Sequence, residues 1–201
     1  MSEKFSFRLG GLKDEVIRKS IHVGFGIVIC FLYTIFQRDL LTIGLLFSLF
    51  IVFFFEVLRF KGMVSVPFLR GREEKKIGGH AFFMLGIFIS ILLFDKQIAI
   101  ASVLMLAIGD AASGMAQVVK RGAFPNVKDY KRRIKSPEVI LIMFGVSLLV
   151  GYYTLDSFKM AISGAIGATI ADGVHLRVYG IAIDDNFTIP LYSGILMSLV
   201  S

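Results

Sequence analysis

Seven stretches of mostly apolar residues, separated by short polar segments, dominate this chain of 201 residues. They cover residues 21–36, 40–58, 80–94, 97–119, 138–155, 158–176 and 188–200. A helix that crosses the hydrocarbon core of a bilayer needs about 20 mostly apolar residues. The stretches are continuous and do not alternate with a period of two residues, which favours helices over a transmembrane β-barrel. We therefore predict an all-α, polytopic transmembrane helical bundle of about seven spans.

Composition leaves no room for a soluble domain of useful size. Only 18% of the residues are charged and 56% are hydrophobic, against about 25% and about 45–50% in ordinary globular proteins. The basic residues that give the net charge of +7 lie between apolar stretches and form no separate folded unit, so we expect no nucleic-acid partner. We predict one integral-membrane domain over residues 1–201, with an N-terminal cytoplasmic tail at 1–20.

The distribution of Lys and Arg predicts the orientation. In a seven-span arrangement, 19 of the 22 basic residues fall on the side of the N-terminus, and only Arg38, Lys96 and Lys159 fall on the other. Because loops rich in Lys and Arg stay in the cytoplasm, the N-terminus is expected there and Ser201 outside. The outer loops are only a few residues long, so any chemistry is expected to face the cytoplasm.

Three acids, Glu56, Asp110 and Asp172, lie within apolar stretches. An ionised side chain in the middle of a span costs roughly 2.5–3.5 kcal/mol. One polar cavity in the cytoplasmic half would hold all three, and the alternative is three interface residues that pair with nearby cations, as Glu56 would with Arg59. Because Asn is cheaper than Asp in lipid, we expect Asp110→Asn to leave stability unchanged or raised.

Glu15, Arg18, Lys19 and His22 share one face of the helix that enters the first span. The Arg and Lys side chains are suited to phosphates, the former as a planar fork and the latter as a point charge. A basic anchor for anionic lipid headgroups is the alternative. That alternative accounts for the two cations but not for the acid and the imidazole on the same face.

Small residues surround Asp110 in the segment Gly109-Asp110-Ala-Ala-Ser113-Gly114. Small residues permit close packing of helices, and they equally permit a phosphate or a hydrated metal ion to approach backbone and carboxylate. Mg²⁺ typically binds one or two carboxylates together with substrate phosphates and water. Both interpretations are open from the residues alone.

Two further polar segments precede predicted helices. Residues 131–138 carry four cations, including Lys135, followed by Ser136 and a Pro suited to a first helical turn. The start of a helix is itself an anion site. The segment Asp184-Asp185-Asn186 precedes the last span, where one such residue would suffice as a helix cap, so a metal or nucleotide role competes with capping. The chain contains no P-loop and no dinucleotide-binding glycine motif.

Four motifs, in chain order, resemble those of the CTP-dependent lipid kinases, a family that includes dolichol (polyprenol), phytol and diacylglycerol kinases. They are Glu15-x-x-Arg18-Lys19-x-x-His22, Gly109-Asp110, Lys135-Ser136-x-Glu138 and Asp184-Asp185-Asn186-x-x-x-Pro190. The resemblance implies a membrane-embedded kinase of lipid alcohols, dolichol kinase-like, that transfers the γ-phosphate of CTP with Mg²⁺ or another divalent cation.

The resemblance also implies a role for each candidate residue. Asp110, together with Asp184 or Asp185, is expected to hold the metal ion. The proton of the substrate hydroxyl is expected to pass to His22 or Asp172. The nucleotide and its phosphates are expected to contact Arg18, Lys19, Gly109, Ser113, Gly114, Lys135, Ser136 and Asn186.

Two other functions compete with the kinase. A cytidylyltransferase that uses CTP to make a CDP-lipid would need similar ligands and would release pyrophosphate instead of CDP. A small transporter would use buried acids to couple ion movement, but inverted repeats, which favour transporters, are not evident in the sequence.

Overall fold

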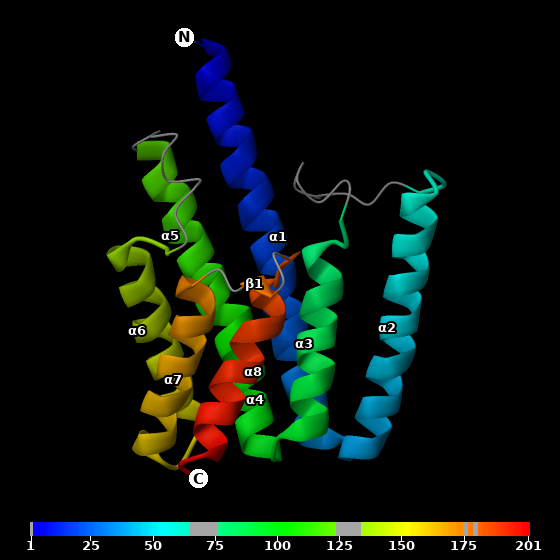
Figure 1. Ribbon diagram of the computed structural model, residues 1–201, viewed down its shortest axis with the longest axis vertical. Helices are drawn as coiled ribbons and strands as arrows, with labels where there is room; N and C mark the ends of the chain where they lie inside the picture. The colour runs from blue at the N-terminus through cyan, green and yellow to red at the C-terminus, as the bar shows by residue number, and fades with distance from the viewer. Residues whose placement is uncertain (1, 65–75, 124–133, 175–176, 179–180) are drawn as a thin grey trace.

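Seven helical rods, which run alternately up and down in Figure 1, account for most of the residues that the structure describes. The structure is a computed structural model that describes residues 2–64, 76–123, 134–174, 177–178 and 181–201. The rods are α1 (Ser2–Ile35), α2 (Arg38–Phe60), α3 (Gly79–Leu93), a continuous rod made of α4 (Lys96–Leu104), η2 (Met105–Gly109) and α5 (Asp110–Ala123), then α6 (Pro137–Thr154), α7 (Phe158–Gly173) and α8 (Asp185–Ser198).

Each of the seven apolar stretches coincides with one of these rods. Four helical segments are long and apolar enough to cross a membrane, namely Glu15–Ile35, Arg38–Phe60, Lys96–Lys120 and Pro137–Thr154. They identify the chain as an integral membrane protein. The other three rods are shorter, with 15 residues in α3, 16 in α7 and 14 in α8. The seven-span arrangement and its orientation therefore stay predictions.

The rod formed by α4, η2 and α5 is the centre of the bundle. Within its candidate span, 72% of the residues are buried, against 22–33% in the other three. In η2 the backbone takes a wider π-helical turn, a feature that is common beside functional sites. Small residues let neighbouring helices approach this turn: a Cβ added at Gly26 of α1 would lie 2.5 Å from the Cβ of Ala107. The close approach brings α1 against the rod just before Asp110.

Helices α7 and α8 pack closely on each other, and the candidate site lies where α7 ends and α8 begins. A Cβ added at Gly167 of α7 would lie 2.5 Å from the carbonyl oxygen of Tyr192 in α8, so only glycine fits at this crossing. Between the two helices, β1 (Arg177–Val178) pairs antiparallel with β2 (Ile181–Ala182). The fold is helical as predicted, and these two strands of two residues each are its one departure from all-α among the described residues. Figure 1 shows α7 ending and α8 beginning partway along α1 and along the continuous rod of α4, η2 and α5.

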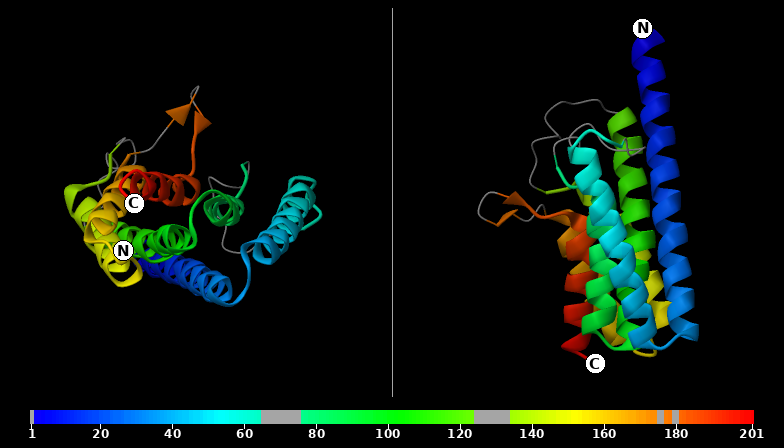
Figure 2. Two further views of the ribbon diagram at one scale, coloured as in Figure 1. Left: turned by 90° about the horizontal axis from the view of Figure 1, so that it is seen from below. Right: turned by 90° about the vertical axis from the view of Figure 1, so that its right-hand side faces the viewer.

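Helix α2 stands apart from the other rods, as the view from below in Figure 2 shows. Its buried apolar side chains are Leu41, Leu45 and Leu49, a stripe confined to its first half. Much of the remaining apolar surface of α2 is exposed, as is expected for a helix that faces lipid. Helix α2 therefore packs on the bundle mainly through α3.

Candidate functional site

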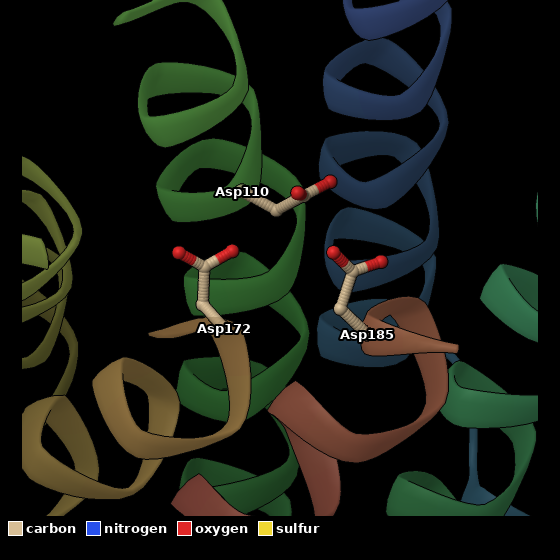
Figure 3. Close-up of side chains that lie close together, drawn as sticks. All are labelled: Asp110, Asp172 and Asp185. Atoms are coloured by element: carbon tan, nitrogen blue, oxygen red, sulfur yellow. The ribbon is translucent and has the colours of Figure 1, made fainter. Parts of the chain in front are cut away.

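Three carboxylates from three different helices meet at the level where α7 ends and α8 begins (Figure 3). Asp110 is the first residue of α5, Asp172 lies one residue before the end of α7, and Asp185 is the first residue of α8. One oxygen from each lies within 4.8 Å of the others. Asp110 and Asp172 are only 4% and 2% exposed, so their charges are held away from water. Such a group requires cations close by.

Two buried lysines supply positive charge to this carboxylate group. Lys19 of α1 forms an ion pair with Asp110. The Nζ atom of Lys135 lies 2.5 Å from Asp172 Oδ1 and 3.7 Å from Asp185 Oδ2. Burial acts to lower the pKa of Lys135, but the surrounding carboxylates outweigh it and raise the pKa above its usual value. Lys135 is therefore a permanently charged member of the site.

The position of Lys135 depends on the end of α7. Its backbone N–H donates to the carbonyl of Gly173 at 3.0 Å, and the preceding Ile134 forms an antiparallel bridge with Val174. These contacts hold the segment before α6 beside Asp172. Residues 131–133, which were expected to add cations to the site, lie outside the described residues.

Small residues in α5 make room for the ion pairs. A Cβ at Gly114 would lie 2.8 Å from Cε and 3.3 Å from Nζ of Lys19, so glycine leaves the path of this lysine open. The hydroxyl of Ser113 lies 3.2 Å from Asp172 Oδ1 and donates a hydrogen bond to it. Gly109 serves packing instead, because a Cβ there would meet Ser147 Oγ at 2.9 Å. The close-packing interpretation thus holds at Gly109, and the approach of a phosphate or metal ion to this segment stays a prediction.

Asp184 does not belong to the three-carboxylate group. It caps α8, and its Oδ1 accepts hydrogen bonds from the backbone N–H of Asn186 at 3.1 Å and from the side-chain amide of Asn186 at 2.7 Å. Burial, followed by repulsion from Asp185, raises the pKa of Asp184 to about 6. Among the described residues, the group of acids that could hold a metal ion therefore contains Asp172 and does not contain Asp184. The buried Oδ1 of Asn186 has no hydrogen-bond partner among the described residues.

Arg18 and His22 lie on α1 above and below Lys19. The guanidinium of Arg18 pairs with Glu15 at 2.5 Å, while its Nε is buried without a described partner. The imidazole of His22 stacks on Phe83 of α3 with ring centroids 4.4 Å apart, and its Nδ1 is buried without a described partner. The face of α1 predicted from sequence therefore points into the bundle beside the carboxylate group.

Other residues singled out in the sequence lie outside the three-carboxylate group. Ser136 is the N-cap residue of α6 but makes no side-chain cap bond, and Glu138 pairs with Lys120 at 2.6 Å on the surface. Glu56 does not share a cavity with the other two acids. Its carboxylate is bonded to Arg59 at 2.6 Å, to the N–H of Gly78 at 3.1 Å and to His80 at 3.2 Å, which ties the end of α2 to the start of α3.

A shared polar cavity for Asp110 and Asp172 was one of the two interpretations that the sequence left open, and the two acids do lie together. From the sequence, Asp172 was expected to act as a base and was not placed beside Asp185. Two features of the sequence pointed to Asp172: it is an acid within an apolar stretch, and Gly173 follows it directly.

Comparison with known proteins gives one informative match. No family model and no solved structure matches this chain. The chain is 23% identical over 225 residues to the CTP-dependent diacylglycerol kinase 1 of Saccharomyces cerevisiae, and the alignment covers 94% of this chain and 74% of that protein. This distant similarity supports the resemblance to the CTP-dependent lipid kinases that the motifs indicate.

Proposed function

We propose that this protein is a CTP-dependent kinase of a membrane-embedded lipid alcohol. The observation that carries the proposal is the meeting of Asp110, Asp172 and Asp185 with Lys19 and Lys135 in a buried site. Phosphoryl transfer depends mainly on positioning and on electrostatic stabilisation of the phosphates, which acidic metal ligands and nearby cations provide. The similarity to a CTP-dependent diacylglycerol kinase supports both the reaction and the nucleotide.

The three carboxylates fit a divalent cation such as Mg²⁺. All the donors are oxygens, which Mg²⁺ prefers, and Asp172 Oδ2 is buried without a hydrogen-bond partner among the described residues. An unpaired buried carboxylate oxygen is costly unless a ligand contacts it. Asp110, Asp172 and Asp185 would hold the ion, which when bound would neutralise charge on the phosphate oxygens of the nucleotide.

The lysines would bind the phosphates that the metal does not. Lys19 and Lys135 each contact a carboxylate of the group, so each is within reach of phosphates carried by the ion. Arg18 lies one residue from Lys19, and we assign it to the outer phosphates. We assign Ser113, Gly114, Ser136 and Asn186 to the walls of the nucleotide site.

In the reaction, the hydroxyl oxygen of the lipid forms a bond with the γ-phosphorus of CTP. The bond from that phosphorus to the oxygen it shares with the β-phosphate breaks, and CDP leaves. The hydroxyl proton must pass to a base. Of the two candidates, His22 suits this role better, because Asp172 is assigned to the metal ion and its Oδ1 already accepts hydrogen bonds from Lys135 and Ser113.

The substrate could carry an isoprenoid or a diacylglycerol tail, since both need only an apolar surface. We propose diacylglycerol and polyprenols as the first substrates to test. In the seven-span arrangement with a cytoplasmic N-terminus, the site would open to the cytoplasm, which supplies the nucleotide.

The proposal is tested by incubating the purified protein with CTP and with ATP in micelles that contain diacylglycerol, a polyprenol or phytol. CTP labelled on its γ-phosphate should give a labelled lipid monophosphate and unlabelled CDP, and ATP should be a poor donor. Labelled product from α-labelled CTP, with release of pyrophosphate, would instead identify a cytidylyltransferase. Absence of a product with every alcohol would contradict the proposal.

A further inference from the structure

One side of α1 changes from polar to apolar over about two turns, facing α3. Arg18, His22 and Phe25 follow one another along this side at helical spacing. Phe83 of α3 contacts the last two: its ring stacks on His22 and meets Phe25 edge to face, with centroids 6.3 Å apart. The order of a charged group, a polar group and an apolar group matches that of a lipid lying along the bilayer normal.

His22 is the polar group in the middle of this order. Its residue is 6% exposed, yet Nδ1 has no hydrogen-bond partner among the described residues. A buried nitrogen without a partner costs free energy that a bound hydroxyl would recover. Lys19, which pairs with Asp110, lies three residues earlier on the same helix. A hydroxyl bonded to Nδ1 would thus lie beside the carboxylate group.

Phe25 is not covered by the rest of the bundle. Its side chain packs on Phe83 but the residue remains 38% exposed, and α2 packs through Leu41, Leu45 and Leu49 in its first half while standing off as a whole (Figure 2). Next to Phe25, by contrast, Gly26 lies directly against Ala107. The surface at Phe25 therefore continues from His22 toward lipid.

We propose that the lipid alcohol binds on this side of α1, with its hydroxyl donating to His22 Nδ1 and its tail against Phe25. The inference rests on the proposed kinase function and adds the position of the acceptor. When the hydroxyl oxygen bonds to phosphorus, its proton moves to Nδ1, so the O–H bond breaks as an N–H bond forms. Phe83 acts as a positioning residue, because its stacked ring orients the imidazole.

Binding can be measured by fluorescence because the chain contains no Trp. The Phe25→Trp variant is titrated in detergent micelles with brominated diacylglycerol, whose bromine atoms quench an indole on contact. Phe31→Trp is the matched control, the same substitution on the same helix at a residue that is 62% exposed and lies on another side. For Phe25→Trp we expect quenching that saturates at a low mole fraction of brominated diacylglycerol in the micelles. For Phe31→Trp we expect quenching that rises in proportion to that mole fraction.

Brominated phosphatidylcholine has no free hydroxyl for phosphorylation. It therefore distinguishes specific binding at the proposed site from general contact between the protein and lipid. It should quench both variants in simple proportion to its fraction. Proportional quenching of Phe25→Trp by diacylglycerol as well would overturn the inference. Because the readout is binding, saturable quenching in a protein that phosphorylates no lipid would retain the lipid site and reject the kinase proposal.

The role of His22 is tested in the Phe25→Trp background. His22→Phe keeps a ring against Phe83 but removes Nδ1, and should weaken diacylglycerol binding by about 2- to 10-fold, the range of one neutral hydrogen bond. His22→Asn places an amide near Nδ1 and should recover part of this loss. In the wild-type background, His22→Phe should lower kcat, because the base is lost, and should raise KM for the alcohol more than KM for CTP. Equal binding by all three proteins would overturn the assignment of the hydroxyl to His22.

Discussion

The ammonium group of Lys19 on α1 pairs with the carboxylate of Asp110, 91 residues further along the chain at the first position of α5. Each side chain is only 5% exposed. Removing one partner of a buried ion pair costs about 3–5 kcal/mol, because the other charge is left uncompensated. The neighbouring carboxylates will reduce this cost but not remove it.

We therefore expect Asp110→Asn to abolish lipid phosphorylation and also to lower the unfolding temperature. The sequence alone led to the opposite expectation for stability. Combining Asp110→Asn with Lys19→Met should restore much of the unfolding temperature without restoring activity. Thermal unfolding in detergent and a kinase assay on the same preparations measure both effects, and a fully active Asp110→Asn protein would refute the metal assignment.

Asp185 offers a milder test of the metal site, because its side chain is 36% exposed and its loss should leave the fold intact. Asp185→Asn is expected to raise the Mg²⁺ concentration for half-maximal activity by about 10- to 100-fold, since a contact to a charged group contributes about 1.5–3 kcal/mol. Asp95→Asn is the control, an exposed acid in the turn before α4 whose side chain makes no cap bond. An unchanged Mg²⁺ requirement in Asp185→Asn would exclude Asp185 as a ligand.

Gly114→Ala tests whether the path of Lys19 matters. The added methyl would lie 2.8 Å from Lys19 Cε, so the flexible lysine must shift away from Asp110. Activity should fall while the protein stays folded. Gly145→Ala is the matched control in α6, where nothing lies within 4 Å of an added Cβ, and it should gain roughly 0.5–1 kcal/mol of stability with normal activity. Equal activities of the two variants would contradict the role given to Gly114.

Asp184 makes stability depend on pH. Burial and Asp185 raise its pKa to about 6, whereas an unfolded Asp has a pKa of about 3.9. The folded protein thus binds the Asp184 proton more tightly than the unfolded protein does. The stabilisation that this proton provides is complete below about pH 4 and is lost as the pH rises through about 6. The loss is at most about 3 kcal/mol for a shift of two units.

Asp184→Asn keeps a capping acceptor without the charge. The variant should therefore unfold at a higher temperature than the wild type above pH 6, and the difference should vanish below pH 4. Thermal unfolding across pH 3.5–8 measures this. A difference that does not vary with pH would show that ionisation of Asp184 is not responsible.

The orientation is tested by cysteine labelling after Cys30→Ala removes the native thiol. Lys13→Cys should react with an impermeant reagent from the cytoplasmic side, and Lys96→Cys from the opposite side, since both residues are exposed and lie at the two predicted faces. Labelling of Lys13→Cys from outside would reverse the orientation and place the site on the wrong side for cytoplasmic nucleotide.

The sequence by itself determined where the helices lie, because long apolar stretches form helices in a membrane whatever their neighbours are. It also identified Lys19, Asp110, Lys135 and Asp185 as candidates, since ionisable side chains beside or within such stretches are costly unless they have partners. One element was not predicted from the sequence, the strand pair after α7. Its strands β1 and β2 have only two residues each, too few for a recognisable pattern.

Only the tertiary structure decided which acids meet. Asp184 and Asp185 are neighbours in the sequence, yet Asp185 joins the carboxylate group while Asp184 caps α8. The difference arises from where α7 ends and α8 begins, and that depends on the glycine-mediated packing of the two helices around Gly167. The direction in which a carboxylate side chain points depends on where its helix ends and on how that helix packs against the others. These contacts between helices distant in sequence cannot be read from the local pattern of residues.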